Sequence, residues 1–506
     1  MIFLKKIISN KVFCILAYLL FSLFLSITLY KYITTATIYK LYFQKKLVLV
    51  LLLTILLIIF AKLILKNNKG LQYIYLIIVL PISFCYCIFQ PYGQKFDEPY
   101  HFFRAYTIAD GNIFTKKNAK GYSAISVPKH LLKQSALINN KHVKIEGALL
   151  EKTDYKDTTK VSSTAATYSF VSYLPEVAAI KVSQWFGLNV LYMQYLCRIF
   201  VNLVCVFISF LALSLLKSYK MVALIILLNP ILLHQQTAIS GDSLLNSLSI
   251  LFVAYIISLL QKNEKVRPAS ILYLFIMLIL LFLMKSVYVT MGLFMLLLLP
   301  KIDIKKARVI DYVIGLLLII VTIIYLYYSS KYNNFKTETA YIIKGVNTIG
   351  QIKFILLNPL KFLMVLFNSI MCYGELYIKM LAGGSLAWGD LDISSGVYFL
   401  WFILFVLSPF LVREAYYLPK RHNNAMILFS IFIFLLTLIG IYLCWNPVGS
   451  SIINGFQGRY LIPLLLPFII SFSNKKSYVS NKPIYIYILL MIINVITLYQ
   501  IYCSYI

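Results

Sequence analysis

Long apolar segments recur along almost the whole chain, and no other feature restricts its fold as strongly. Because 61% of the 506 residues are hydrophobic and only 13% are charged, a water-soluble domain would have too little polar surface. A helix needs roughly 20 apolar residues to cross a bilayer. The sequence therefore predicts an all-α membrane protein with about 13 transmembrane helices, at residues 12–30, 47–65, 71–90, 192–216, 221–237, 243–260, 270–284, 286–300, 310–328, 396–412, 425–444, 459–473 and 484–503.

Lysine and arginine occupy short linkers between these segments rather than one basic face. The formal net charge of +30 therefore indicates orientation in the membrane, and nucleic acid is not expected as a partner. Alternate linkers are basic if the N-terminus is cytoplasmic, which predicts a multi-pass protein of the cell membrane with residues 91–170 outside. The topology of the first hairpin stays open, because its external linker carries Lys31, Lys40, Lys45 and Lys46.

Three regions follow from this pattern. Residues 1–70 form an N-terminal transmembrane hairpin, residues 71–473 a membrane domain, and residues 474–506 a cytoplasmic loop and the last transmembrane helix. The membrane domain includes the large external loop 91–170, where we expect short helices that form a lid. Segments 167–189 and 359–381 are predicted as interfacial helices, because the basic linkers after them alternate correctly only if neither crosses.

The stretch "FDEPYHFFRAY" at the mouth of the third segment is the first candidate for chemistry. Asp97 or Glu98 can cap a helix, with His101 and Arg104 placed four and seven residues after Asp97 on one face. A plain helix cap explains the carboxylates. Alternatively, a carboxylate at this depth acts as a general base toward a sugar hydroxyl, while His101 or Arg104 steers a phosphate.

Three more charged residues stand at the outer ends of predicted spans. Asp242 lies in the external turn "AISGDSLLNS", where a capped helix or a functional carboxylate fits equally well. Lys285 either extends to the outer interface or binds a phosphate. Arg459 opposes the positive-inside pattern, which favours binding of an anionic group.

Other chemistries find little support in the sequence. It contains no Walker loop, no dinucleotide glycine fingerprint and no HExxH motif, so cytosolic ATP-driven transport and zinc proteolysis are disfavoured. Nearly all of the eight cysteines lie in or beside apolar segments, which indicates packing rather than disulfides or a metal site.

The motifs "DEPYHFFRAYTIADGN", "YSFVSYLP", "LCRIFVNLV", "SGDSLLNSL", "KSVYV", "GGSLAWGDLD" and "QGRYLIPLLLP" follow one another over roughly residues 90–470. In this order the chain resembles domain-of-unknown-function family 2142, whose members look like relatives of the GT-C glycosyltransferases. The resemblance implies a GT-C-like fold and transfer of a sugar from a polyprenyl-phosphate carrier outside the membrane. The chain departs from the common pattern in having two spans before the span that leads to the acidic loop.

On that pattern, Asp97 is the first choice for the catalytic base and Glu98 the second. Arg198, Lys285 and Arg459 become candidates for binding the lipid phosphate, and Asp242 for binding a sugar. Some GT-C enzymes use a divalent cation, and the two adjacent carboxylates do not decide whether this chain does. No other cofactor is implied.

The leading hypothesis is thus a glycosyltransferase that acts on a cell-surface glycan or teichoic-acid-type acceptor. Its partners would be the lipid-linked sugar, the glycan acceptor and the bilayer. A transporter or flippase of a lipid-linked saccharide is the alternative from another class, and it predicts broken helices near the middle of the membrane. A polysaccharide polymerase or ligase that uses pyrophosphate carriers is the third.

Overall fold

The computed structural model describes residues 70–117, 123–138, 157–162, 164–303, 309–332, 343–473 and 484–505. The hairpin predicted at 12–30 and 47–65 lies outside the described residues, and so does nearly all of region 1–70.

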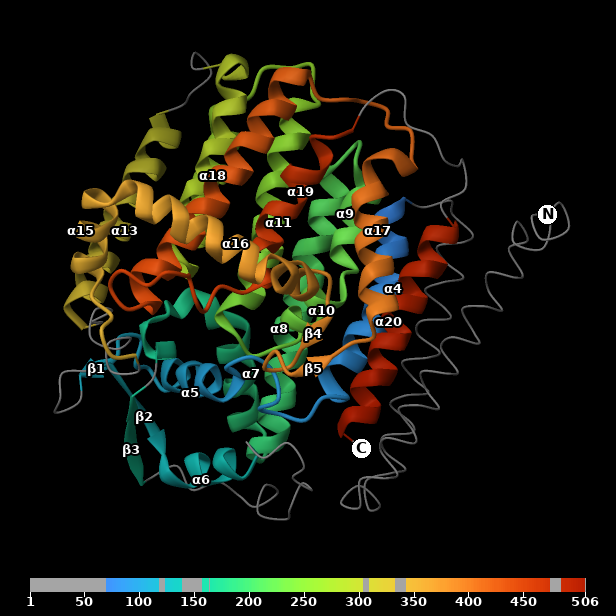
Figure 1. Cartoon of the computed structure of the whole chain (residues 1–506). Coiled ribbons are helices and arrows are strands. Elements are labelled where there is room, and N and C mark those ends of the chain that lie inside the picture. Colours follow the sequence, from blue (N-terminus) through green and yellow to red (C-terminus); the bar gives the residue numbers. More distant parts are fainter. Residues whose placement is uncertain are drawn as a thin grey trace, which may run out of the picture.

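Helices dominate the described chain (Figure 1). The long helices that match predicted spans are α4 (Leu71–Ile88), α8 (Val190–Leu215), α11 (Gly241–Leu260), α12 (Pro268–Met284), α13 (Val309–Tyr332), α17 (Ser395–Leu411), α18 (Lys420–Trp445) and α20 (Ile484–Tyr505). The other helices are α5 (Glu98–Ala109), α6 (Lys129–Ile138), α7 (Leu174–Trp185), α9 (Lys220–Leu227), α10 (Pro230–Gln236), α15 (Thr348–Leu357), α16 (Pro359–Leu381) and α19 (Ile462–Ile470), with 3₁₀ helices η3 (Thr164–Thr167), η4 (Phe170–Tyr173), η5 (Ser286–Lys301) and η7 (Gly458–Leu461). Among the described residues, 7 helices are long and apolar enough to span a membrane. This agrees with a helical membrane protein, while the number of 13 spans stays a prediction.

The two ends of the bundle differ in character. The linker between α17 and α18, which contains Arg413, lies at the top of Figure 1, and strands β1–β3 lie at the opposite end. The alternation of basic linkers predicts that the end with the strands lies outside the membrane. We refer to the end with the strands as the outer end.

Segment 221–237 was expected to be one helix and is two. Helix α9 ends at Leu227, and α10 begins at Pro230. Proline disfavours a helical conformation in the residue before it and lacks an N–H group, so the apolar run breaks here. Asn229 caps the new helix by accepting a hydrogen bond from the Ile231 N–H (3.1 Å), and its Nδ2 donates to the carbonyl of Leu381 (2.8 Å). The break fixes the direction in which α10 carries its polar end.

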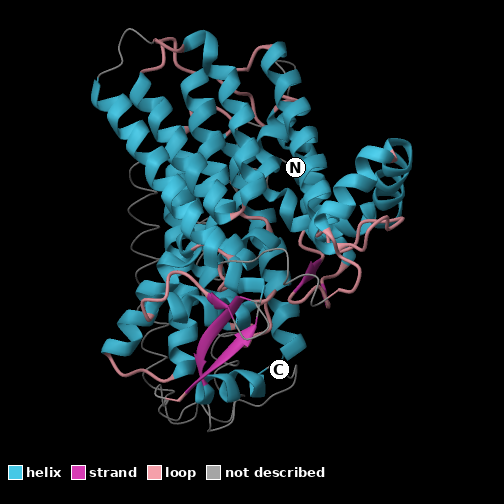
Figure 2. Ribbon diagram, turned by 90° about the vertical axis from the view of Figure 1, so that its left-hand side faces the viewer, coloured by secondary structure: helices cyan, strands magenta, loops and turns pink. Residues whose placement is uncertain are grey.

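The external loop contains strands that the expectation of short helices did not include. β1 (Lys116–Lys117), β2 (Ser123–Pro128) and β3 (Thr158–Ser162) form an antiparallel sheet in the order β1-β2-β3, with Ile125 opposite Val161 (Figure 2). Ile125 is buried together with Phe102 of α5 and Met193 of α8. The loop therefore shares its core with the membrane helices, which agrees with too little apolar sequence for an independent domain.

The two segments predicted as interfacial both form helices, and their placement at the membrane surface stays a prediction. Residues 167–189 form short helices and α7, which turns into α8 at Gly187 with a φ of 62°. Residues 359–381 form the single helix α16, which is long enough to span a membrane but lies across the neighbouring helices in Figure 1. Its interfacial placement remains a prediction.

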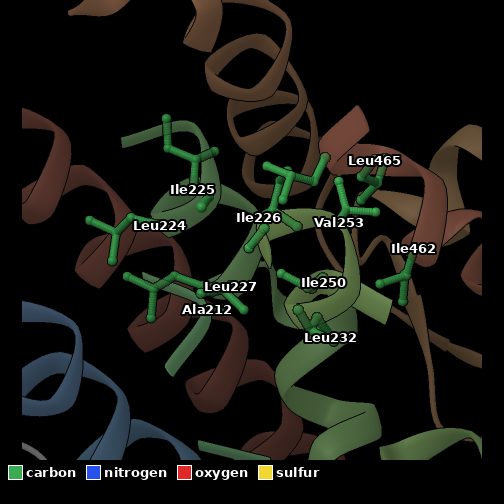
Figure 3. Close-up of a cluster of buried hydrophobic side chains, with 14 of the residues drawn as sticks. Ala212, Leu224, Ile225, Ile226, Leu227, Leu232, Ile250, Val253, Ile462 and Leu465 are labelled. Carbon is green, nitrogen blue, oxygen red and sulfur yellow. The ribbon is translucent and has the colours of Figure 1, made fainter. Parts of the chain in front are cut away.

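A buried apolar core joins the helices that carry the site. Figure 3 shows Ile226 of α9, Val253 of α11 and Leu465 of α19 packed together. All residues of α9 from Met221 to Leu227 are buried. This packing gives α10, α11 and η7 a fixed support at the outer end.

Candidate functional site

Five of the eight residues singled out from the sequence gather at the outer end. They come from four separate parts of the chain: Asp97 and His101 at α5, Asp242 at the start of α11, Lys285 between α12 and η5, and Arg459 in η7. Lys285 Nζ lies 3.2 Å from Asp242 Oδ1. His101 interacts electrostatically with all four others, and Arg459 with both Asp97 and Asp242. We call these five residues the outer-end cluster.

Asp97 begins α5 without capping it. Its backbone is left-handed, with a φ of 54°, and its side chain accepts no capping hydrogen bond, which corrects the cap interpretation. The Asp97 carbonyl accepts from the N–H groups of Tyr100 and His101, each at 3.1 Å. Asp is one of the few residues that tolerate this conformation. The helix start therefore leaves the carboxylate unused by the backbone.

Glu98 points away from the cluster, into the protein. Its side chain is fully buried, and Arg198 binds both carboxylate oxygens, at 2.7 and 2.6 Å. The N–H groups of Gly93 (2.9 Å) and Ile239 (3.3 Å) donate to the same carboxylate. A carboxylate with so many donors and no exposure favours a structural role over that of a base.

Arg198 also has all of its N–H groups bound within the protein. Its remaining N–H groups donate to the carbonyls of Cys87 (2.8 Å), Gln90 (2.6 Å) and Pro91 (3.0 Å). The pair ties α8 to the chain that leads out of α4. This arrangement favours a structural role for Arg198 rather than binding of a lipid phosphate.

Arg104 also donates its hydrogen bonds to backbone carbonyls. It donates to the carbonyls of Tyr168 (3.2 Å), Asn112 (3.3 Å) and Ile113 (2.6 Å), and it is 1% exposed. These contacts hold the segment before η4 against α5. Arg104 thus places Tyr168 rather than steering a ligand.

His101 lies between Tyr168 of that segment and Tyr173, the last residue of η4. Its Nδ1 is 2.5 Å from the Tyr173 hydroxyl, and its ring meets Tyr168 edge-on with centroids 5.1 Å apart. Burial lowers the pKa of His101 and raises that of Tyr173 well above its ordinary value. Tyr173 therefore keeps its proton and can donate it to Nδ1 of a neutral imidazole, which leaves the other ring nitrogen as a donor.

Asp242 and Lys285 form an ion pair that is shielded by aromatic rings. Ser240 caps α11 by accepting from the Asp242 N–H, at 3.2 Å. Lys285 Nζ lies 3.9 Å from the centre of the Tyr460 ring. Gly241 has no side chain where a Cβ would come within 2.5 Å of the Tyr168 ring. The motif "SGDSLLNSL" thus needs its glycine to bring α11 close to the external loop.

Arg459 is delivered by a close approach of two backbones. A Cβ on Gly458 would lie 2.0 Å from the Tyr377 carbonyl oxygen of α16, so only glycine fits there. The Arg459 guanidinium lies 4.1 Å from the centre of the Phe96 ring, and its Nη1 donates to Gln235 Oε1 at 3.3 Å. Arg459 is 6% exposed and forms no ion pair within the described parts of the chain.

Lys95 is a charged group that the sequence analysis missed. Its ammonium donates to the carbonyls of Tyr86 (3.0 Å) and Thr237 (2.7 Å) and to the Thr237 hydroxyl (2.7 Å). Burial and then the charge of Arg198 lower the pKa of Lys95 to about 7. Gln235 was missed too, although the polar run "HQQT" at the end of an apolar segment was a visible signal.

A small β-hairpin contacts the segment between α4 and α5, which leads to Asp97. β4 (Ser385–Leu386) pairs with β5 (Leu391–Asp392), and Trp388 between them donates from Nε1 to the carbonyl of Gly93 at 2.9 Å. Lys379 Nζ binds Asp392 Oδ1 at 2.8 Å. The motif "GGSLAWGDLD" therefore positions the backbone that precedes Asp97.

Metal ligands do not gather in the part of the chain that the structure describes. No three His, Cys, Asp or Glu side chains come together there, and its cysteines are free. Glu98 turns to Arg198 and so does not stand beside Asp97 as a second ligand. A divalent cation remains an expectation from the resemblance.

Comparison with known proteins gives a family and nothing more specific. A family model described as "Predicted membrane protein (DUF2142)" matches residues 82–468. No curated protein and no solved structure matches. The matched range contains all five residues of the outer-end cluster.

Proposed function

Because the chain belongs to the family of predicted membrane proteins DUF2142, we propose a function from the chemistry of its outer-end cluster. The protein is a GT-C-like membrane glycosyltransferase. It moves a sugar from a polyprenyl-phosphate carrier to a cell-surface glycan or teichoic-acid-type acceptor, on the outer face of the cell membrane.

One observation carries this proposal. A carboxylate that its own helix does not use, Asp97, lies within electrostatic reach of the buried guanidinium of Arg459. Glycosyl transfer from a lipid phosphate needs a base for the acceptor hydroxyl and a cation for the departing phosphate. The cluster supplies both, at the outer end of the helix bundle.

The other cluster residues have supporting roles in this mechanism. Asp97 removes the proton from the acceptor hydroxyl as the oxygen bonds to the anomeric carbon and the bond from that carbon to the phosphate oxygen breaks. Arg459 and Lys285 stabilise the negative charge on the phosphate. Asp242 holds Lys285 and accepts from a sugar hydroxyl, and neutral His101 donates to the substrate.

Replacement of Asp97 by Asn is the sharpest test. Asn tolerates the left-handed backbone equally well and keeps the shape of the side chain, so the change removes only the charge. We expect transfer of sugar to the surface glycan to fall by at least about 10²-fold with normal protein levels, as for the loss of a general base. Unchanged glycan would reject Asp97 as the base. Asp110, an exposed residue at the other end of α5, provides the matched control in Asp110→Asn.

A flippase for a lipid-linked saccharide is the second candidate, and the break between α9 and α10 favours it. Transporters bind substrates at interrupted helices, and His234, Gln235 and Gln236 of α10 are all buried. Proteoliposomes separate the two functions. Movement of a fluorescent polyprenyl-phosphate sugar between leaflets without an acceptor favours a flippase, whereas transfer to an acceptor without such movement favours the transferase.

A further inference from the structure

Arg459 and Gln235 hold unused hydrogen-bond donors inside the protein. Gln235 Oε1 accepts from Arg459 Nη1 at 3.3 Å, but Gln235 Nε2 and Arg459 Nε have no partner in the described structure. Gln235 is 1% exposed and Arg459 6%. Buried donors are nearly always satisfied in folded proteins, and two orphans on one hydrogen-bonded pair point to an absent acceptor.

The charge around the pair specifies which acceptor fits. The Arg459 guanidinium rests on the Phe96 ring at 4.1 Å and forms no ion pair in the described residues. The nearby carboxylate of Asp242 is held by Lys285. A buried cation without a bonded counter-ion is costly, so an anionic oxygen is favoured over a water molecule.

The position of Gln235 depends on the break between α9 and α10. The break at Pro230 starts a new helix, and its last turn brings Gln235 to η7, more than 200 residues further along the chain. The next residue, Gln236, faces elsewhere, because its Nε2 donates to Ser209 (3.3 Å) and Ser247 (2.9 Å). Two adjacent glutamines thus have different surroundings, and only one has an idle amide N–H beside a cation.

We propose that Gln235 and Arg459 form a buried clamp for an anionic oxygen of the phosphate-ester class. In this clamp Gln235 contacts the anion directly. The amide donates one hydrogen bond and the guanidinium Nε another, in addition to the guanidinium charge. The choice of a phosphate ester as the anion, and of the headgroup of the lipid carrier as its source, rests on the proposed function. The clamp itself does not.

Phosphate binding to the purified full-length protein in a neutral detergent tests the clamp. We would titrate inorganic phosphate and, separately, dodecyl phosphate, and follow binding by calorimetry. Gln235→Leu should weaken the binding of the phosphate probe about tenfold or more, as expected for the loss of a hydrogen bond to a charged group. Gln236→Leu, the matched control, should leave the dissociation constant unchanged. Binding of dodecyl phosphate alone supports a lipid headgroup, and equal binding of both supports a phosphate site without a lipid requirement.

Gln235→Glu keeps the test decisive if the leucine variant fails to fold. A carboxylate at this position pairs with Arg459, so the protein should keep or gain thermal stability while phosphate binding is lost. Phosphate affinity equal to that of the wild type in Gln235→Leu or Gln235→Glu overturns the clamp, and so does a wild-type protein that binds neither probe. A protein that binds phosphate but transfers no sugar refutes the proposed function and leaves the clamp standing.

Discussion

The buried ion pair of Glu98 and Arg198 allows a test of whether Glu98 stabilises the fold or takes part in catalysis. Both side chains have zero exposure, and Arg198 makes five hydrogen bonds, two of them to Glu98. Glu98→Gln leaves the guanidinium buried without its counter-charge. Removal of one partner of such a pair costs ~3–5 kcal/mol, a factor of roughly 10²–10⁴ in the unfolding equilibrium. Folded proteins are stable by only about 5–15 kcal/mol, so the variant should show a large loss.

The assay is thermal unfolding of the purified protein in detergent, with Arg198→Met and the double variant completing a cycle. We expect the double variant to be less destabilised than the sum of the two single variants, because each orphaned charge is removed with its partner. The matched control is Asp157→Asn, which breaks the exposed pair of Asp157 and Lys129 (3.0 Å) and should cost no more than about 1 kcal/mol. A Glu98→Gln protein that unfolds like the wild type but transfers no sugar would refute this reasoning and return Glu98 to the catalytic candidates.

The contribution of the same pair to folding stability should decrease at low pH. Burial alone would raise the pKa of Glu98, but the charge and hydrogen bonds of Arg198 outweigh it and hold the pKa below its ordinary value. A carboxylate whose pKa is lowered by folding stabilises the protein above its unfolded pKa, roughly 4.3. This stabilisation should disappear as the pH falls through the lower pKa of the folded state, and Glu98→Gln should lack the change.

Three other perturbations follow from the packing. Gly458→Ala puts a methyl 2.0 Å from a carbonyl oxygen of α16 and should cost about 1–3 kcal/mol in thermal unfolding, while Gly440→Ala, with open space inside α18, should gain up to ~1 kcal/mol. Glu176 is fully buried and forms no ion pair within the described residues, and burial raises its pKa to about 8. Folding stability should therefore fall between pH ~4.3 and ~8, at most by about 1.4 kcal/mol per pH unit, and Glu176→Gln should flatten that slope in melting curves. Arg104→Leu leaves buried carbonyls without donors, so its melting temperature should drop, and an unchanged melting temperature would contradict the backbone-holding role.

The positions of the helices could be predicted from the sequence because hydrophobic length is a local property. Predicted segments such as 243–260 and 425–444 match α11 and α18 closely. The break before Pro230 was missed, because segment 221–237 was predicted as one helix, although the Asn-Pro pair that interrupts the apolar run was a visible signal. The strand pairing of β2 with β3 was not, because it joins segments about 30 residues apart whose register depends on the loop between them.

The roles of the charged residues were harder to predict, because they depend on contacts between distant segments. The sequence places two carboxylates side by side at Asp97 and Glu98, and only the left-handed backbone of Asp97 separates their directions. Arg198 lies 100 residues away from Glu98 in the sequence, so no local pattern reveals that it pairs with Glu98 rather than with Asp97. By contrast, the sequence singled out Arg459 as an arginine that the topology does not explain, and it lies in the outer-end cluster, whereas Gln235 beside it was missed.

The cations at the outer end differ in what a ligand would have to displace. Arg198 and Lys95 are bound to backbone carbonyls, so an anion that drew them away would leave buried acceptors without donors, at about 1–3 kcal/mol each. Arg459 instead rests on Phe96, and Lys285 on Tyr460. Their polar partners are side chains, Asp242 for Lys285 at 3.2 Å and Gln235 for Arg459 at 3.3 Å, so among the described residues an anion that met them would leave no buried carbonyl without its donor. This difference supports Arg459 and Lys285, rather than Arg198 and Lys95, as the candidates for binding an anion.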